Sequence, residues 1–150
     1  MQTFWLSGAE WAAVLRIGLG LWLLASRLHK DKKTWFAGGG IAWAAGIAEK
    51  HRLPVVRRCF DQVVRPRPRP VTRIVVDAEL ALGLARVLGF LTPIGLVGGL
   101  LLDLLSFVQM VHDRTEQGQN LMVALISVVA FMAVAWQAWS LDRLLGLFQR

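Results

Sequence analysis

Residues 117–141 read QGQNLMVALISVVAFMAVAWQAWSL, and this uncharged stretch decides the fold. A membrane-spanning helix needs about 20 mostly apolar residues, each adding a rise of about 1.5 Å, and water-soluble cores rarely need so long a run without a charge. The stretch begins within a polar cluster, EQGQN at residues 116–120, and Trp136, Trp139 and Asp142 mark its end. Indole rings favour the headgroup boundary, because the ring is apolar and its N–H needs a polar partner. The sequence therefore predicts an integral membrane protein.

The overall composition agrees with that prediction. The chain has 150 residues, of which 55% are hydrophobic, and its mean hydropathy is +0.50. This length allows one small domain. The single cysteine, Cys59, excludes an internal disulfide and a CxxC redox pair, so redox chemistry would need a bound cofactor or a partner. The N-terminal sequence MQTFW lacks the positive region of a cleavable signal peptide, which favours a retained membrane anchor.

Outward from residues 117–141, the apolar pattern predicts an all-α fold, an integral membrane four-helix bundle in a single domain, residues 1–150. We expect membrane spans at about 9–28, 72–91, 94–111 and 118–139. The turn around Thr92 and Pro93 is so short that the second and third spans must be antiparallel neighbours.

A long basic loop, residues 29–71, separates the first two spans. Residues 34–48 are apolar but too short to span, which favours a re-entrant or interfacial segment. Residues 53–64 are typical of a short basic amphipathic helix, with one apolar face formed by Val56, Phe60, Val63 and Val64. The RPRPRP run at residues 65–70 predicts an extended spacer, because each proline lacks an N–H and restricts the residue before it.

The net charge of +7 is concentrated in this loop: residues 29–73 hold eleven of the 17 Lys and Arg and three of the ten Asp and Glu. One interpretation is a nucleic-acid-binding segment. The other is a cytoplasmic loop next to anionic lipid, and the apolar segments on both sides favour it, so we expect no nucleic-acid partner. The loop and residues 112–116 then lie on the cytoplasmic side of the cell membrane. Both termini and the Thr92–Pro93 turn lie on the opposite side. The candidate surface for a partner or lipid headgroups is formed by Arg57, Arg58, Arg65, Arg67 and Arg69.

Ionisable side chains within spans are costly and normally face a bundle interior or a wet cavity. At about 1.5 Å per residue, Arg16 lies roughly 10 Å, Arg86 roughly 8 Å and Asp103 roughly 14 Å below the outer face, so these three side chains could meet. Nearer the inner face, Glu79 lies at the level of Gln109, His112 and Asn120. The candidate intramembrane polar cluster is therefore Arg16, Glu79, Arg86, Asp103 and Asn120.

This polar cluster has two interpretations. In the structural one, the groups satisfy one another and hold the helices in register. In the functional one, they form a site for a polar headgroup, such as a quinone carbonyl, or a proton path. Gly83, on the same helix face as Glu79 and Arg86, would let a neighbouring helix or a ligand approach closely. No catalytic or phosphate-binding motif is present, and His29, His51 and His112 lack metal-ligand spacing, so we expect neither catalytic residues nor a metal site.

Four short motifs in the chain are LRIGLGLW at 15–22, ELALG at 79–83, EQGQNL at 116–121 and WSLD at 139–142. In this order they resemble the DoxX/DoxD family of small four-span membrane proteins. The DoxD branch is similar to the small subunit of thiosulfate:quinone oxidoreductase, which works with a partner subunit. Other members are similar to membrane anchors for soluble redox or detoxifying enzymes. The resemblance implies a membrane redox role, and we interpret the basic loop as a docking surface.

The main hypothesis is a small, non-catalytic integral membrane subunit or anchor of a membrane-bound redox complex, in contact with lipid and with other subunits. Small-residue contact stripes for such subunits are expected on the third span, at Gly95, Gly98 and Gly99. The alternative is an enzyme, a DoxD-type subunit of a thiosulfate:quinone oxidoreductase that binds a quinone cofactor in the bundle. A transporter or proton conduit, suggested by Glu79 and Asp103, is a third interpretation.

Overall fold

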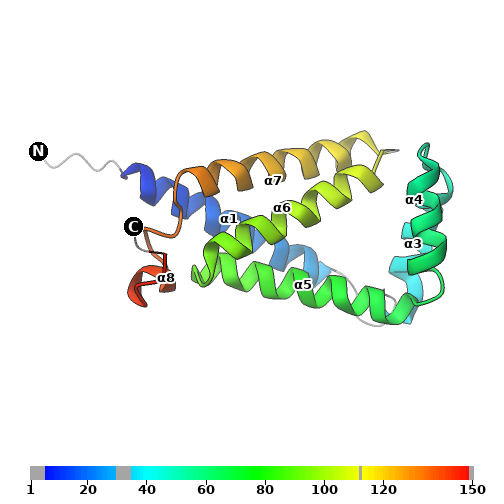
Figure 1. Cartoon of the computed structure of the whole chain (residues 1–150), viewed down its shortest axis with the longest axis horizontal. Helices are drawn as coiled ribbons and strands as arrows, with labels where there is room; N and C mark the ends of the chain where they lie inside the picture. The colour runs from blue at the N-terminus through cyan, green and yellow to red at the C-terminus, as the bar shows by residue number, and fades with distance from the viewer. Residues whose placement is uncertain (1–5, 30–34, 112, 149–150) are drawn as a thin grey trace, which may run out of the picture.

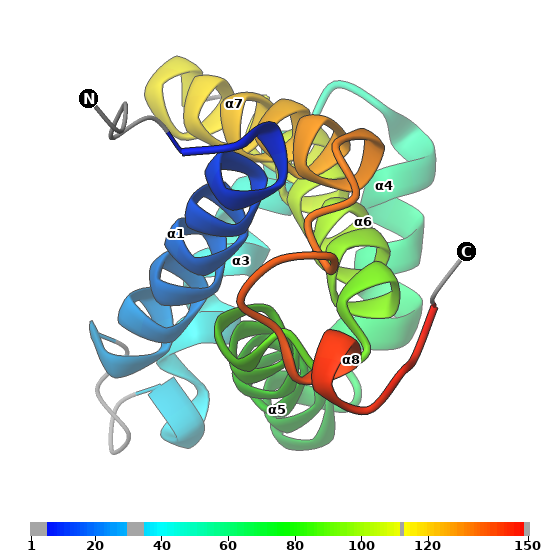
Figure 2. The ribbon, with the colours of Figure 1, turned by 90° about the vertical axis from the view of Figure 1, so that its left-hand side faces the viewer.

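The computed structural model describes residues 6–29, 35–111 and 113–148, and all regular structure in these ranges is helical. Four long helices, α1 (Gly8–His29), α5 (Pro68–Leu88), α6 (Thr92–Gln109) and α7 (Arg114–Met132), form a bundle. Each packs against two others, in the cyclic order α1, α5, α6, α7 (Figures 1 and 2). The expected helical class and the number of long helices are confirmed, and so is the antiparallel packing of α5 and α6 (Figure 1).

The two ends of the bundle differ. The beginning of α1, the turn between α5 and α6, and the C-terminal segment share one end, here called the termini end (Figure 1). The loop between α1 and α5 and the turn between α6 and α7 share the opposite end, here called the hairpin end. This arrangement is the one expected from the charge pattern. Some residues that the sequence interpretation used lie outside the described ranges: Trp5, Lys30, Lys32, Lys33 and His112.

The basic loop is helical and lies across the hairpin end (Figure 1). We call residues 35–64 the basic hairpin; it comprises the π-helical turn η1 (Trp35–Gly39), α3 (Gly40–Glu49), α4 (Pro54–Cys59) and the π-helical turn η2 (Phe60–Val64). Buried His51 connects it to α6. Its Nδ1 accepts a hydrogen bond from the Leu53 N–H at 3.1 Å, so Nε2 carries the proton and donates to the Val108 carbonyl at 2.7 Å.

The amphipathic face expected in residues 53–64 is correct except at Val63. Phe60 is buried, and Val56 and Val64 are half-buried, but Val63 is 48% exposed. A π-helical turn contains more residues than an α-helical one, and therefore η2 rotates the side chains after Phe60 away from the expected face.

The extended spacer expected at residues 65–70 is also wrong, because α5 begins at Pro68 and includes Pro70. The first N–H groups of a helix have no partner within it, so proline costs no hydrogen bond there and its fixed φ suits the first turn. The helix ends at Leu88 because Gly89 adopts a left-handed conformation with φ of 65°. It thus starts and ends several residues before the expected span at 72–91.

The expected limits of the last two spans also shift. α6 begins two residues before the expected 94–111, at Thr92. α7 begins at Arg114 because the Asp113 carboxylate accepts hydrogen bonds from the N–H groups of Thr115 and Glu116, at 2.9 and 3.1 Å. Residues 114–116, expected in a loop, are therefore the first turn of the helix. The expected end at residue 139 is wrong, because the chain leaves the helix after Met132 and turns back.

Glycines allow close contacts between the long helices of the bundle. A Cβ on Gly20 of α1 would lie 2.8 Å from the Gly83 carbonyl oxygen, which confirms the close approach expected at Gly83. A Cβ on Gly99 would overlap Nη2 of Arg86, and Gly95 also faces α5. Gly95 and Gly99 are buried and Gly98 packs against Leu82, so the outward-facing stripe expected on this helix is wrong: these glycines make room for α5.

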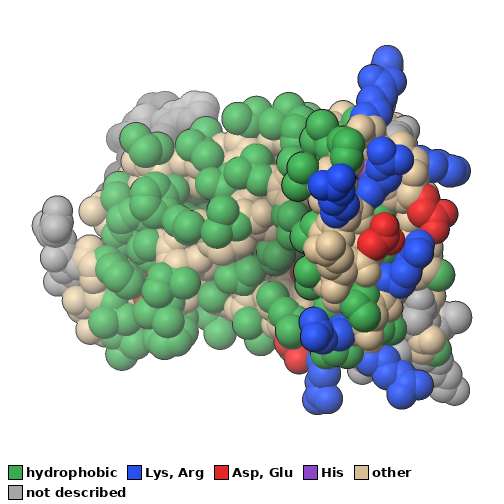
Figure 3. All heavy atoms as spheres, turned by 45° about the vertical axis from the view of Figure 1, so that its right-hand side comes forward, with side chains coloured by type: hydrophobic (Ala, Val, Ile, Leu, Met, Phe, Trp, Pro, Cys, Tyr) green, Lys and Arg blue, Asp and Glu red, His purple; other side chains and the backbone are tan. Residues whose placement is uncertain are grey.

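Several polar side chains are buried inside the bundle, and many large apolar side chains are exposed on its sides. Arg16 and Arg86 are the largest fully buried side chains of the described residues, and most of the buried apolar ones are alanines. Large apolar side chains instead cover the sides, where Leu101 is 62% and Met132 is 75% exposed (Figure 3). Two helices, over Gly8–Leu28 and Thr92–Gln109, are long and apolar enough to cross a membrane. α5 and α7 carry more charged and polar residues and are less apolar.

Candidate functional site

A polar chamber of about 380 Å³ lies inside the hairpin end of the bundle, between the four long helices and the basic hairpin. This volume falls in the range of roughly 300–1,000 Å³ that is typical of small-molecule sites. Three helices each contribute one carboxylate to its wall: Glu79 from α5, Asp103 from α6 and Glu116 from α7.

The remaining lining combines neutral polar groups with aromatic rings. The chamber is lined by two amides, Gln109 and Asn120, by three hydroxyls, and by aromatic and aliphatic side chains that include Trp22, Trp35 and Phe60. No Lys, Arg or His lines the chamber in the part of the chain that the structure describes. Among the described residues, the charged side chains of the lining are therefore all acidic.

Asp103 is the most deeply placed of the three carboxylates. It is 6% exposed, and its Oδ2 atom is buried without a hydrogen-bond partner. Arg86 attracts it electrostatically, but Nη1 of Arg86 is also buried without a partner, so these two atoms do not pair directly. An unpaired buried carboxylate oxygen is energetically costly, which makes Asp103 an acceptor available to a ligand.

Arg86 lies behind the chamber wall and joins three helices. From α5, its Nε donates to the Gly95 carbonyl at 3.1 Å, and its Nη2 donates to the Leu96 carbonyl and the Ser127 Oγ, at 3.3 and 3.2 Å. The Ser127 hydroxyl, on α7, donates its own hydrogen bond to the Val123 carbonyl at 3.0 Å. These bonds use the rigid fork of the guanidinium to fix the position of α6 and α7 relative to α5.

Arg16 joins α1 to the termini end. It donates to the backbone carbonyls of Arg86, Trp139 and Ala138, at 2.9, 2.7 and 3.4 Å. Ala138 and Trp139 belong to residues 133–148, a C-terminal segment that crosses this end of the bundle and contains the short helix α8 (Leu141–Leu144) (Figure 2). A buried charge that is surrounded by carbonyl acceptors is a structural group rather than a free binding group.

Asp142 is a buried residue whose role sequence analysis missed. It is fully buried, and its two carboxylate oxygens accept hydrogen bonds from the N–H groups of Leu91 and Thr92, both at 2.7 Å. Its own N–H donates to the Gly89 carbonyl at 2.9 Å. The carboxylate caps the N-terminus of α6, where unpaired N–H groups and the helix dipole favour a negative charge, and it also attracts Arg16. An acid directly after the last apolar run, at the same end as the α5–α6 turn, was the available signal.

The candidate polar cluster therefore divides into two parts. Glu79, Asp103 and Asn120 line the chamber together, whereas Arg16 and Arg86 do not line it. The two arginines belong to the network that holds the helices and the C-terminal segment. Of the described residues, no group of three or more His, Cys, Asp or Glu side chains is arranged to hold a metal ion.

The candidate basic surface lies on the hairpin and the start of α5. All five of its arginines are exposed: Arg57, Arg58, Arg65, Arg67 and Arg69. Arg65 pairs with Glu49 at 2.7 Å and approaches Asp61 at 3.5 Å, so its charge is partly balanced. Figure 3 shows that, on this face, lysine and arginine side chains gather at the hairpin end while apolar side chains cover the bundle.

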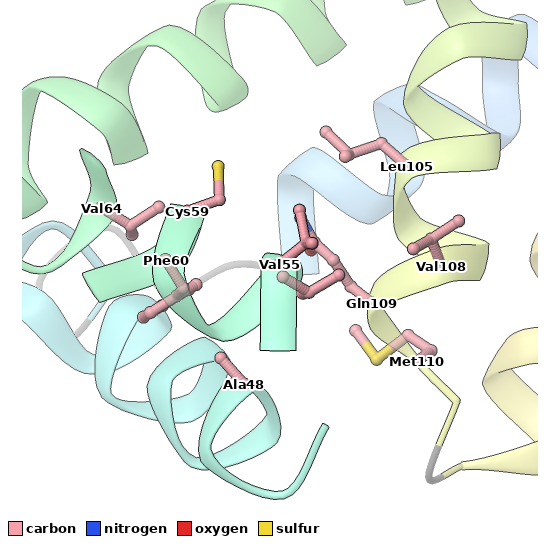
Figure 4. A pocket seen from close by; sticks show the side chains of 10 residues that line it. Ala48, Val55, Cys59, Phe60, Val64, Leu105, Val108, Gln109 and Met110 are labelled. Carbon is pink, nitrogen blue, oxygen red and sulfur yellow. The ribbon is translucent and has the colours of Figure 1, made fainter. Parts of the chain in front are cut away.

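An apolar groove of about 260 Å³ separates the basic hairpin from α6 (Figure 4). Val55, Cys59 and Phe60 line it from the hairpin, and Leu105 and Val108 line it from α6. The groove and the chamber share five lining residues: Phe60, Val64, Leu105, Gln109 and Met110. An acidic, aromatic chamber therefore adjoins a groove that is almost entirely apolar.

Comparison with known proteins gives no further assignment: no protein-family model, curated protein or solved structure matches the chain.

Proposed function

We propose that this chain is a small integral membrane subunit, or anchor, of a membrane-bound redox complex, with four spans and no catalytic centre of its own. The membrane part of the proposal rests on the reversed distribution of side chains: Arg16, Arg86 and Asp142 are buried, whereas Leu101 and Met132 are exposed. In water this distribution would be unfavourable, because large apolar side chains would stay exposed to solvent. In lipid, apolar side chains lose nothing by facing outward and polar groups must find partners inside.

The charged residues of α5 are compatible with a span. Arg69, Arg73 and Asp77 are exposed and lie in its first half, toward the hairpin end, and Arg86 is enclosed by α6 and α7. The polar residues of α7, from Arg114 to Asn120, likewise lie at the hairpin end. Headgroups and water at that end would solvate these groups. The apolar sides of both helices would then contact lipid.

The anchor part of the proposal rests on the basic hairpin. Arg57 and Arg58 are exposed on α4 and do not line the groove, and they would face the aqueous phase at the cytoplasmic side of the cell membrane. Such a surface suits an acidic soluble partner or anionic headgroups. The redox part rests on the sequence motifs alone.

Native purification tests this proposal. We expect the tagged protein to leave its own membranes only with detergent and to carry electron-transfer subunits in fixed stoichiometry, identified by mass spectrometry. Replacing Arg57→Glu and Arg58→Glu together should lower recovery of a soluble partner by at least about tenfold, because like charges across an interface cost several kcal/mol. The span-mediated association with membrane subunits should persist.

The matched control is Arg114→Glu, which changes an exposed arginine at the same end of the bundle but outside the hairpin. It should leave partner recovery within about twofold of the wild-type value, which is the effect expected from changing a single exposed charge. Extraction by alkaline washing without detergent, or purification of the chain without any other subunit, would contradict the proposal.

A further inference from the structure

We propose that the groove between the basic hairpin and α6 holds an acyl chain of an anionic phospholipid, whose phosphate group is bound by Arg52 and Arg58. The inference rests on the membrane location proposed above and names a partner for the basic hairpin. Three observations about the described residues support it: the lining of the groove, the charge of the hairpin, and the place of the two arginines next to the groove.

The first observation is that the groove is apolar and uncovered. Its volume is about 260 Å³, and among the described residues no charged side chain lines it. Val55 on the hairpin wall is 74% exposed and Leu105 on the α6 wall is 54% exposed (Figure 4). At the level of the lipid headgroups, water would reach this surface. An acyl chain between the two walls would remove the apolar surface from water.

The second observation is an excess of arginine that the hairpin does not balance. Its two acids, Glu49 and Asp61, both lie next to Arg65, at 2.7 and 3.5 Å. Arg52 and Arg58 are exposed, and neither forms an ion pair with another described residue. The guanidinium fork matches the oxygens of a phosphate group. A second copy of this basic surface would be repelled, whereas an anionic lipid is attracted.

The third observation is that both arginines lie close to the groove. Arg58 comes three residues after Val55, so helical spacing places it beside the face of α4 that lines the groove. Arg52 follows His51, whose Nε2 donates to the carbonyl of Val108 on the opposite wall. Basic charge and an apolar groove are therefore adjacent at the hairpin end. A phospholipid joins a phosphate to apolar chains and would use both, whereas an acidic soluble protein would use mainly the charge.

Native mass spectrometry of the purified full-length chain in mild detergent tests the headgroup contact. The probes are dioleoyl phosphatidylglycerol and dioleoyl phosphatidylcholine, which have the same acyl chains and differ in net charge. We expect saturable binding of the anionic lipid, at least about fivefold tighter than binding of the zwitterionic one, as arginines near an anionic headgroup should give. Arg52→Gln combined with Arg58→Gln should abolish this preference. Arg114→Gln changes an exposed arginine at the same end that lies outside the hairpin, and should preserve it.

A pair of aspartate variants tests the place of the acyl chain. Val55→Asp puts a carboxylate on the groove wall and should weaken binding of both lipids by at least about tenfold, because the acyl chain would desolvate the charge. Val63→Asp is the matched control, since Val63 is also exposed on the hairpin but does not line the groove. It adds the same charge and should weaken binding by less than about threefold, the effect of one exposed charge.

Four results would overturn the proposal. They are the absence of saturable lipid binding, equal binding of the two lipids, equal effects of the two aspartates, and displacement of the lipid by an excess of glycerol 3-phosphate. The last result would make this a site for free phosphate compounds. If the double arginine variant loses an acidic soluble protein but keeps its lipid preference, the arginines bind that protein and the proposal is also wrong.

Failure of this proposal is distinguishable from failure of the proposed function. The lipid assay uses the chain alone, and the variants that lose lipid should still purify with the membrane subunits of the complex. Purification with those subunits but without any lipid preference would overturn the lipid site and leave the anchor role intact. Lipid preference in a chain that purifies without other subunits would support the lipid site and contradict the anchor role.

Discussion

Replacing Asp142 with alanine is expected to be among the most damaging single changes in the chain. The carboxylate is fully buried and accepts two hydrogen bonds of 2.7 Å from the first N–H groups at the start of α6. Its loss leaves these donors buried without partners and removes an attraction on the buried Arg16 guanidinium. Breaking a buried charged interaction of this kind costs about 3–5 kcal/mol.

The matched control is Asp113→Ala, which removes the equivalent cap from α7. Its carboxylate also accepts two N–H groups, from Thr115 and Glu116, but it is exposed to solvent. Water can replace an exposed cap, so we expect a loss of only about 1 kcal/mol. Both losses of stability would be measured by heating the purified proteins and recording the fraction that remains monodisperse. Equal losses in the two variants would show that burial of Asp142 adds nothing.

Replacing Arg86 with leucine is expected to have a similarly large effect. Its guanidinium reaches Gly95, Leu96 and Ser127, and its charge is the one that offsets buried Asp103. Without it, Asp103 becomes an uncompensated buried charge, at a cost of about 3–5 kcal/mol. Arg86→Lys keeps the charge but not the planar guanidinium, so its stability should lie between that of Arg86→Leu and that of the wild type.

Two further variants separate charge from packing. Arg73→Leu removes an exposed arginine from the same helix, whose contact with Asp77 is 3.8 Å, and should cost less than about 1 kcal/mol. Arg86→Leu combined with Asp103→Leu removes both buried charges and should be more stable than Arg86→Leu alone, since replacing a buried pair by apolar residues is often neutral. If the double variant is less stable than the single one, the charge argument is wrong.

The helical class and the number of long helices could be predicted, because apolar runs of this length have a clear periodicity and composition. Their limits could not. Pro68 and Pro70 argue for an extended chain unless their place in the first turn of a helix is known. The long helix α7 ends at Met132 although the apolar run continues, because Val134 and Trp139 adopt positive φ values of 49° and 46° and turn the chain back.

The candidate site was predictable only in part, for a related reason. Counting residues along each span placed Glu79 at the level of Asn120, and in the structure both residues line the chamber. The same counting grouped Arg16 with Asp103. Arg16 instead binds carbonyls of the C-terminal segment, because that segment folds back over the termini end and brings Asp142 to the α5–α6 turn. These contacts join residues 50 to 123 positions apart, and spacing within one helix carries no signal of them.

The topology of the chain tests the central claim, four spans with the basic hairpin on one face, most directly. Cys59 is exposed on the hairpin and serves as one probe. Gly8→Cys, Phe90→Cys and Thr115→Cys, each combined with Cys59→Ser, report on the other turns and the start of α1. The measurement is labelling by a membrane-impermeant maleimide in sealed vesicles of both orientations.

Four spans predict that Cys59 and Thr115→Cys react from the cytoplasmic side, and that Gly8→Cys and Phe90→Cys react from the opposite side. If only α1 and α6 crossed the membrane, Phe90→Cys would be labelled from the same side as Cys59. Thr115→Cys and Gly8→Cys would then both be labelled from the other side. The second pattern, or reaction of all four cysteines from one side, would contradict the account.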